Sequence, residues 1–157
     1  MNVVEMMNKQ REMDSLIMNN NNITDYPMES MKIAYRVELG ELLNEWQNFK
    51  FWKKNKTFSK KDFLLEFADC LAFALSLETQ CPFYTPHKYE QLDEVNIGYI
   101  YARVSLNDVI DMCFECLPSV LMNTIVLGHK LGITLDEMER AYNYKYKINL
   151  ERQQNGY

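Results

Sequence analysis

The sequence contains few of the residues that interrupt regular secondary structure. Only 5 glycines and 4 prolines occur among its 157 residues, which argues against a turn-rich fold and favours long helices. The hydrophobic fraction of 47% and the charged fraction of 25% exclude an intrinsically disordered chain. A chain of this length can bury one substantial core, so we expect a single domain over residues 1–157.

Three other features are missing, and each excludes a partner or a location. The net charge of −5 lacks the basic surplus that broad nucleic-acid binding requires. No run of about 18 apolar residues is present to cross a membrane. The first residues, MNVVEMMNKQ, lack the basic and apolar regions of a signal peptide, so we expect a cytoplasmic protein.

The 4 cysteines are expected to be reduced thiols in that compartment. Cys113 and Cys116 form a single CxxC pair, which is half of a zinc site, inside an apolar segment that is typical of a buried helix. We therefore interpret both as small core residues rather than as metal ligands.

Apolar periodicity and capping residues predict five helices. Pro27 suits the first position of the second helix, and Pro118 is expected to kink the fourth. Three helix starts show a capping residue with an acid three positions later, namely Ser59–Asp62, Ser105–Asp108 and Thr134–Glu137. The expected helices run over about residues 3–19, 27–54, 59–78, 105–130 and 134–152.

The segment over about residues 79–104 does not fit this pattern. It has two prolines and then an imperfect alternation of apolar residues from Val95 to Val104. We expect a short β-hairpin or an irregular excursion here. Because the segment is too long for a bundle loop, it is expected to be a lid, a partner surface or a family-specific insert. The predicted fold is an all-α bundle with one such insert.

Two of the predicted helices carry carboxylates on their apolar faces. Glu38, Glu41 and Glu45 share one face, and Glu66 and Asp69 lie on the apolar face of the next helix. An ionised carboxylate on a buried face must be paired or bind a metal. Glu38 and Glu41 are three residues apart, as are Glu66 and Asp69, so each pair can reach one point. Oxygen ligands of this kind suit Mg²⁺ or Mn²⁺.

These acids have two other interpretations. They could pair with Lys or Arg or lie at the edge of the apolar face, which would be preferred for a single Glu-x-x-Glu. Their recurrence on two successive helices favours a metal site. A di-iron bundle would need Glu-x-x-His on its helices. The only histidines, His87 and His129, lie in neither helix, so that interpretation fails.

The C-terminal helix adds a cationic face. Lys145, Asn149 and Arg152 follow one another at helical spacing. By itself this pattern would be typical of a solvated helix end. Beside a carboxylate and metal cluster, however, it suits a polyphosphate, because the Arg guanidinium forks onto phosphate oxygens. A nucleoside polyphosphate is therefore the leading ligand.

The sequence resembles the dimeric, all-α dUTP pyrophosphatases of bacteria and phages. They belong to the all-α NTP pyrophosphohydrolase superfamily, which also holds the MazG-like enzymes. The resemblance covers most of the chain except about residues 79–104, which look like the variable region of staphylococcal-phage members. It rests on the segments QREMD, ELGELLNEWQNFKFW, EFADCLAFALSL, LGITLDEMERAY and KYKINLERQQNGY.

The resemblance implies a role for each acidic residue. Glu38, Glu41, Glu66 and Asp69 would hold Mg²⁺, and Glu38 would also orient or deprotonate the attacking water. Glu45 matches the family pattern less well and would contact the metal ligands rather than the metal itself. The implied reaction is hydrolysis of dUTP to dUMP and pyrophosphate by attack at the α-phosphorus. The metal would lower the pKa of the bound water, and Glu38 would take its proton.

The resemblance also implies how the substrate is held. Gln10 would hydrogen-bond the uracil edge, Asp14 would border that pocket, and Trp52 would form an aromatic wall. Many relatives have a histidine three residues after the last acid, where this chain has Ala72. That departure leaves the choice among dUTP, dUDP and dCTP open. The phosphates and the closing segment would involve Lys145, Asn149, Arg152 and Tyr157.

Three alternatives to a dUTP pyrophosphatase remain. The first is a related enzyme for dCTP or with broad MazG-like specificity, and the second is a helical structural domain. The third is a regulator that binds a protein, of the repressor type in phage relatives, through the insert. Binding of such a partner is compatible with an active enzyme. A homodimer is expected, because the apolar residues of about 109–128 exceed what the other helices can cover.

Overall fold

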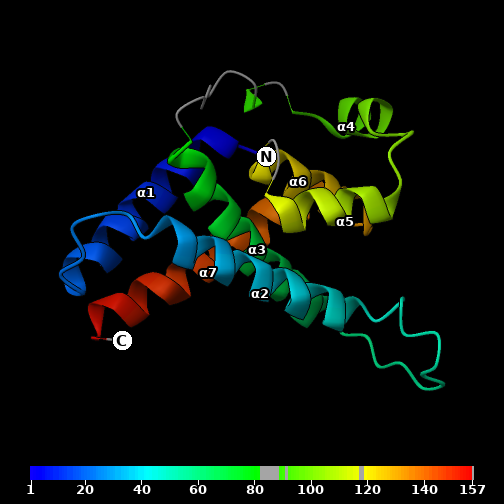
Figure 1. Cartoon of the computed structure of the whole chain (residues 1–157), viewed down its shortest axis with the longest axis horizontal. Helices are drawn as coiled ribbons and strands as arrows, with labels where there is room; N and C mark the ends of the chain where they lie inside the picture. The colour runs from blue at the N-terminus through cyan, green and yellow to red at the C-terminus, as the bar shows by residue number, and fades with distance from the viewer. Residues whose placement is uncertain (82–88, 91, 117–118, 157) are drawn as a thin grey trace.

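The structure is a computed structural model that describes the chain except residues 82–88, 91, 117–118 and 157. Helices make up nearly all of its regular structure, and no strand occurs in the part so described (Figure 1). The all-α prediction is therefore confirmed. The helices are α1 (Val3–Asn20), α2 (Met28–Trp46), α3 (Lys60–Thr79), α4 (Glu94–Ile100), α5 (Leu106–Glu115), α6 (Val120–Lys130) and α7 (Leu135–Gln154).

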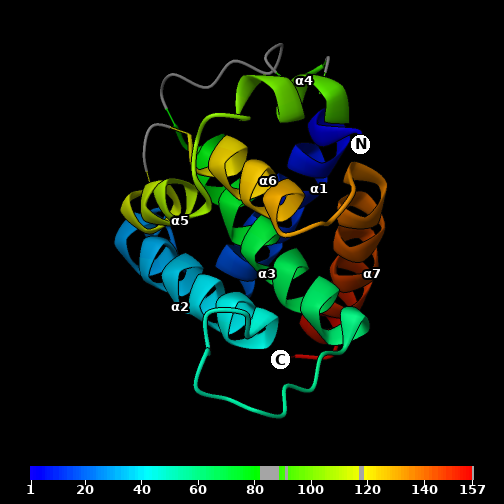
Figure 2. The same ribbon diagram turned by 90° about the vertical axis from the view of Figure 1, so that its right-hand side faces the viewer.

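Helix α3 is the centre of the bundle. It packs against α1, α2, α6 and α7, with α2 and α7 on opposite sides of it (Figure 2). Phe67, Leu71 and Leu75 of α3 are fully buried in the core. This central position explains why α3 is apolar almost all round and why the few acids on it are close to other helices.

Helix α2 forms a hairpin with α3 and contributes a narrow buried stripe. Tyr35, Leu39 and Leu42 are fully buried. The hydroxyl of Tyr35 lies 2.7 Å from that of Thr124 on α6, which in turn donates to the Val120 carbonyl. A buried hydroxyl of this kind needs a partner, so the pair fixes α2 against α6 as well as α3.

The predicted helix starts at Ser59, Ser105 and Thr134 are confirmed. Ser105 and Thr134 form reciprocal capping boxes, and Ser59 accepts from the backbone N–H of Asp62. The prediction that the second helix continues to about residue 54 was wrong. It ends at Trp46 because Gln47 adopts a left-handed conformation with φ 58° and its N–H bonds the Leu43 carbonyl.

The prediction of one helix over about residues 105–130 was also wrong. Helix α5 ends where Cys116 takes a left-handed conformation with φ 58°, and α6 starts at the Ser119 cap. The expected kink at Pro118 lies outside the described residues. Cys113 is buried and Cys116 is partly buried.

The expectation of a short hairpin in the insert is corrected in the same way. Asp93 caps a helix by accepting from the N–H of Asn96, and the first three apolar residues of the apparent alternation, Val95, Ile97 and Tyr99, lie on α4. Ile97 turns inward and is 2% exposed, whereas Val95 and Tyr99 point outward. The Glu94 carboxylate accepts from the backbone N–H of Leu135, which joins α4 to the start of α7. Residues 82–88 and 91 of the insert lie outside the described residues.

No helix in the described ranges combines the length and the apolar character that a membrane crossing needs.

Candidate active site

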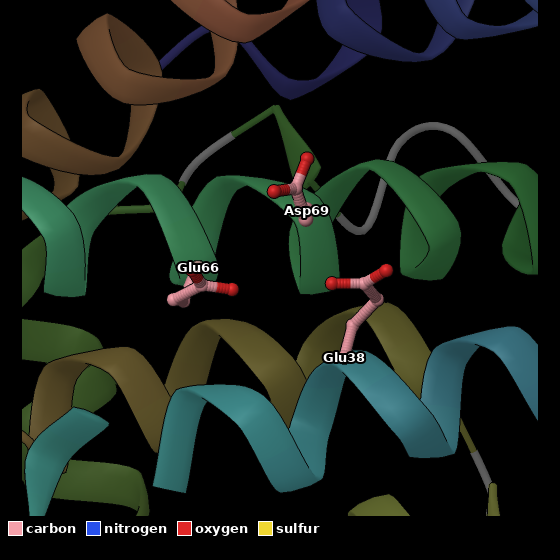
Figure 3. Close-up of side chains that lie close together, drawn as sticks. All are labelled: Glu38, Glu66 and Asp69. Atoms are coloured by element: carbon pink, nitrogen blue, oxygen red, sulfur yellow. The ribbon is translucent and has the colours of Figure 1, made fainter. Parts of the chain in front are cut away.

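Three carboxylates meet between α2 and α3. Glu38 projects from α2 towards Glu66 and Asp69 of α3 (Figure 3). Each of the three offers an oxygen within 4.8 Å of the others, which is close enough to share one cation. The spacing of Glu66 and Asp69 places both on the side of α3 that faces α2, because residues three apart are neighbours on a helix. The two acidic helices of the sequence are therefore brought together.

The cluster has an excess of negative charge. Burial raises the pKa of Glu38 from 4.5 to about 7, and the charges of Asp69 and Glu41 add to the shift. The pKa of Glu66 is raised by burial and then by Asp69. Like charges at this distance resist full ionisation. A divalent cation would remove that resistance, so the donor set fits a hard metal ion.

One cation of the chain already reaches the cluster. The Lys145 ammonium on α7 forms an ion pair of 2.5 Å with Asp69 Oδ2, and both side chains are about one-fifth exposed, at 19% and 20%. Burial raises the pKa of Asp69, while Lys145 and Arg152 act in the opposite direction. Helix α7 therefore supplies positive charge beside the acids, as its sequence pattern predicted.

Glu41 and Glu45 lie further out than the three clustered acids. Glu41 is exposed and is not part of the close group, although its charge raises the pKa of Glu38, Glu66 and Asp69. Glu45 is partly buried and contributes least to the shift of Glu66. The four expected ligands therefore converge on one region, with Glu41 at its solvent edge.

A cavity of about 310 Å³ opens beside the cluster. It lies between α1, the start of α2, α3 and α7, and Asp69 belongs both to its wall and to the acidic cluster. Most of the wall is apolar, from methionine, isoleucine and aromatic side chains. Pockets of this size and character are typical small-molecule sites. Its polar lining includes Gln10, Asp14, Asp69, Lys145, Asn149 and Arg152.

A chain of hydrogen bonds lines the wall formed by α1 and α3. Gln10 Nε2 donates to Asp14 Oδ1 at 2.8 Å, and Ser76 donates to Asp14 Oδ2 at 2.5 Å. Because the Ser76 proton is used there, the hydroxyl of Tyr26, 2.6 Å away, is the donor to Ser76. The Tyr142 hydroxyl, shared with the Met6 carbonyl, donates to Gln10 Oε1 at 3.2 Å.

This chain of hydrogen bonds is largely shielded from water. Gln10 and Asp14 are 7% and 8% exposed. Burial raises the pKa of Asp14, and the bonds from Ser76 and Gln10 oppose that rise. Burial also raises the pKa of Tyr26 to about 12, so this phenol remains a donor at physiological pH. The carboxylate is thus held by donors alone.

Several members of this site were not predicted. Ser76 and Tyr142 lie on the buried faces of α3 and α7, where their sequence context is typical of core residues. A usable signal existed in their spacing, since Ser76 follows Asp69 by two helical turns and Tyr142 precedes Lys145 by three residues.

Among the predicted substrate-binding residues that the structure describes, Trp52 is not brought to the cavity. Trp52 lies in the loop after α2, is 63% exposed, and packs edge-on against Phe49 and Phe51. Tyr157 lies outside the described residues. Ala72, which departs from the pattern of the family that the sequence resembles, lines the cavity beside Phe73 with a methyl group.

Comparison with known protein families gives a match over nearly the whole chain. A family model described as dUTPase matches residues 2–157. No curated protein matches the chain.

Proposed function

Since the chain belongs to the dUTPase family of dUTP diphosphatases, we propose that it hydrolyses dUTP to dUMP and pyrophosphate in the cavity between α1, α3 and α7. The observation that supports this location is the double position of Asp69. It lies in the acidic cluster and also in the wall of the cavity. A ligand in the cavity would therefore have its phosphates next to the metal-binding acids.

Glu38, Glu66 and Asp69 would hold Mg²⁺, and Glu41 would complete the ligand set from the solvent edge. Mn²⁺ would be accepted by the same oxygen donors. When bound, the metal supplies charge neutralisation at the phosphates and acidifies its water. Proton transfer, phosphate binding and recognition of the base would be carried out by protein side chains.

Glu38 is proposed as the general base. It projects from α2 towards Glu66 and Asp69, so its carboxylate would lie beside a water held by the metal. A carboxylate so placed can accept the proton that this water gives up. The water would attack the α-phosphorus, and pyrophosphate would leave.

Lys145, Asn149 and Arg152 are proposed to bind the phosphates. All three line the cavity and come from successive turns of α7. Lys145 also forms an ion pair with Asp69 of the acidic cluster. An ammonium at this position would lie close to phosphate oxygens that approach the acids, and it can donate hydrogen bonds to them.

The nucleoside would extend from the phosphates along the apolar walls to Gln10. Ala72 and Phe73 would border it with apolar surface. Gln10 lies on this wall, and its amide carries both a donor and an acceptor with which to read a base edge. For Trp52 to form a wall of this cavity, its loop would have to move or belong to a second copy of the chain.

The test is pyrophosphate release from dUTP, dCTP, dTTP, UTP and ATP, each with Mg²⁺ and with EDTA. Turnover of dUTP alone, lost in EDTA, is the expected result. Equal turnover of several nucleotides would instead indicate MazG-like specificity. Turnover of dUTP that persists in EDTA would contradict the metal assignment and leave the family unchanged.

We also propose that the protein is a homodimer that buries the outer face of α2. Ile33 and Val37 on this face are 61% and 52% exposed. Gly40 follows on the same face with no atom within 4 Å of where a Cβ would lie. A helical glycine is costly unless another backbone approaches closely. Light scattering of wild type and Val37→Glu tests this, with a dimer and a monomer expected.

The exposed face of α4 is proposed as a site for a regulatory protein. Val95 and Tyr99 there are 79% and 85% exposed. Val95→Glu and Tyr99→Ser should weaken capture of such a partner without changing dUTP turnover. Loss of turnover in these variants would contradict a separate binding surface.

A further inference from the structure

The amide of Gln10 is held from both sides. Its Nε2 donates to Asp14, and its Oε1 accepts from Tyr142. An ionised carboxylate has no proton to give, so only the nitrogen end of the amide can face Asp14. Ser76 holds the other carboxylate oxygen and keeps it in place. One orientation of the Gln10 amide is therefore stabilised over the other.

This orientation matters for base recognition. A primary amide presents one acceptor and one donor side by side, and rotation by 180° exchanges them. Uracil offers a donor at N3 beside a carbonyl acceptor, whereas cytosine offers an acceptor at N3 beside an amino donor. An amide that rotates freely can therefore pair with either base. An amide that cannot rotate selects one.

We propose that Asp14 is a positioning residue whose carboxylate locks the Gln10 amide in the orientation that pairs with uracil and rejects cytosine. The inference rests on the proposed function, because it assumes that the base reaches Gln10. It adds the physical source of selectivity. Pairing with cytosine would turn Oε1 of Gln10 towards the Asp14 carboxylate, which loses a charge-assisted hydrogen bond and adds repulsion.

The lock also explains why the site uses a buried acid at all. Asp14 is 8% exposed, and its charge is costly there unless it is fully hydrogen-bonded. A neutral residue would avoid that cost but could donate as well as accept. Tyr26 donates to the Ser76 hydroxyl, which in turn donates to Asp14, so the hydrogen bonds in this series all run towards the carboxylate.

The experiment measures binding of the α,β-imido analogues of dUTP and dCTP by calorimetry at pH 8. Wild type is expected to prefer the dUTP analogue. Asp14→Asn should reduce that preference by about tenfold or more, the value of one hydrogen bond to a charged group. Asparagine keeps the shape of the side chain but lets the Gln10 amide rotate.

Ser76→Ala is the matched control, because it loosens the same carboxylate without removing its charge. Both analogues should bind this variant more weakly and to a similar degree, so their ratio should stay near that of wild type. A purely structural role for Asp14 would give the same pattern in Asp14→Asn. The ratio of the affinities for the two analogues, rather than either affinity alone, therefore distinguishes a positioning role of Asp14 from a purely structural one.

An Asp14→Asn protein that keeps the full preference would overturn the lock even if wild type hydrolyses dUTP. A wild type that binds neither analogue would overturn the proposed function, and the lock with it. If Asp14→Asn does not fold by circular dichroism, Gln10→Met tests the same step. It should bind the two analogues equally, and a retained preference would show that Gln10 does not read the base.

Discussion

Glu38 lies at the centre of the acidic cluster, and replacing it by glutamine should have opposite effects on stability and on turnover. The substitution keeps the size of the side chain and removes one negative charge from a group that includes Asp69 and Glu66. We expect the metal-free protein to become more stable at pH 8 while hydrolysis of dUTP is largely lost. Stabilisation by removal of a functional charge is typical of a strained active site.

The size of the effect follows from the pKa of Glu38. A shift from 4.5 to about 7 corresponds to at most about 3 kcal/mol between the two protonation states. The side chain is only partly buried, so solvent screening reduces this to about 1 kcal/mol. For a chain of this size, that free energy raises Tm by about 3 °C.

The upward shift in the pKa of Glu38 determines how its contribution to folding stability changes with pH. Because the folded pKa lies above the unfolded value, the stability that Glu38 provides is complete below pH 4.5 and is lost as pH rises through about 7. Glu38→Gln should therefore match wild type in Tm near pH 4.5 and exceed it by about 3 °C at pH 8.

Thermal unfolding in EDTA, followed by circular dichroism across this pH range, measures the difference. Glu29→Gln is a suitable control, since Glu29 is exposed on the same helix beside Lys32. Equal Tm values for wild type and Glu38→Gln at every pH would refute the electrostatic argument. Normal dUTP turnover in Glu38→Gln would refute its role as the base.

Three further predictions follow from other contacts. Mg²⁺ should raise the Tm of wild type more at pH 8 than at pH 5.5, because protons compete with the metal for carboxylates whose pKa is raised. An equal rise in Tm at both pH values in thermal scans would argue against a metal site in the acidic cluster. Lys145→Met should lower kcat/KM for dUTP by roughly tenfold to a hundredfold, because the variant loses a hydrogen bond between two charged groups. Steady-state kinetics equal to those of wild type would contradict phosphate binding by Lys145. Gly128→Ala should destabilise the fold by about 1–3 kcal/mol in urea titrations, because its Cβ would lie 2.5 Å from a ring carbon of Phe67. An unfolding midpoint equal to that of wild type would contradict this close packing.

Local patterns of the sequence determined much of the helical structure. The caps at Ser59, Ser105 and Thr134 act on the backbone of the following turn, so they are readable without any tertiary contact. Helix ends were predicted less well. Gln47 and Cys116 adopt left-handed conformations, which cannot be predicted from their residue types. Both end a helix earlier than the apolar periodicity indicated.

The acids and cations of the site were also evident from sequence, since a charge on an apolar helix face requires a partner. Spacing along a helix indicated that Glu66 and Asp69 lie on the same face of α3. It could not decide that Glu38 lies closer to them than Glu41 does, because that depends on how α2 and α3 are packed. Trp52 shows the reverse case, in which a residue matched by resemblance lies in an exposed loop.

The hydrogen-bonded wall of the cavity was decided by tertiary structure alone. Gln10 and Asp14 are on α1, Ser76 is on α3 and Tyr142 is on α7, and these helices are far apart in the chain. Helical periodicity shows only which side of each helix faces inward. Which inward hydroxyl meets which carboxylate depends on the packing of three helices at once, and hydrogen bonds of 2.5–3.2 Å leave little tolerance for any other arrangement.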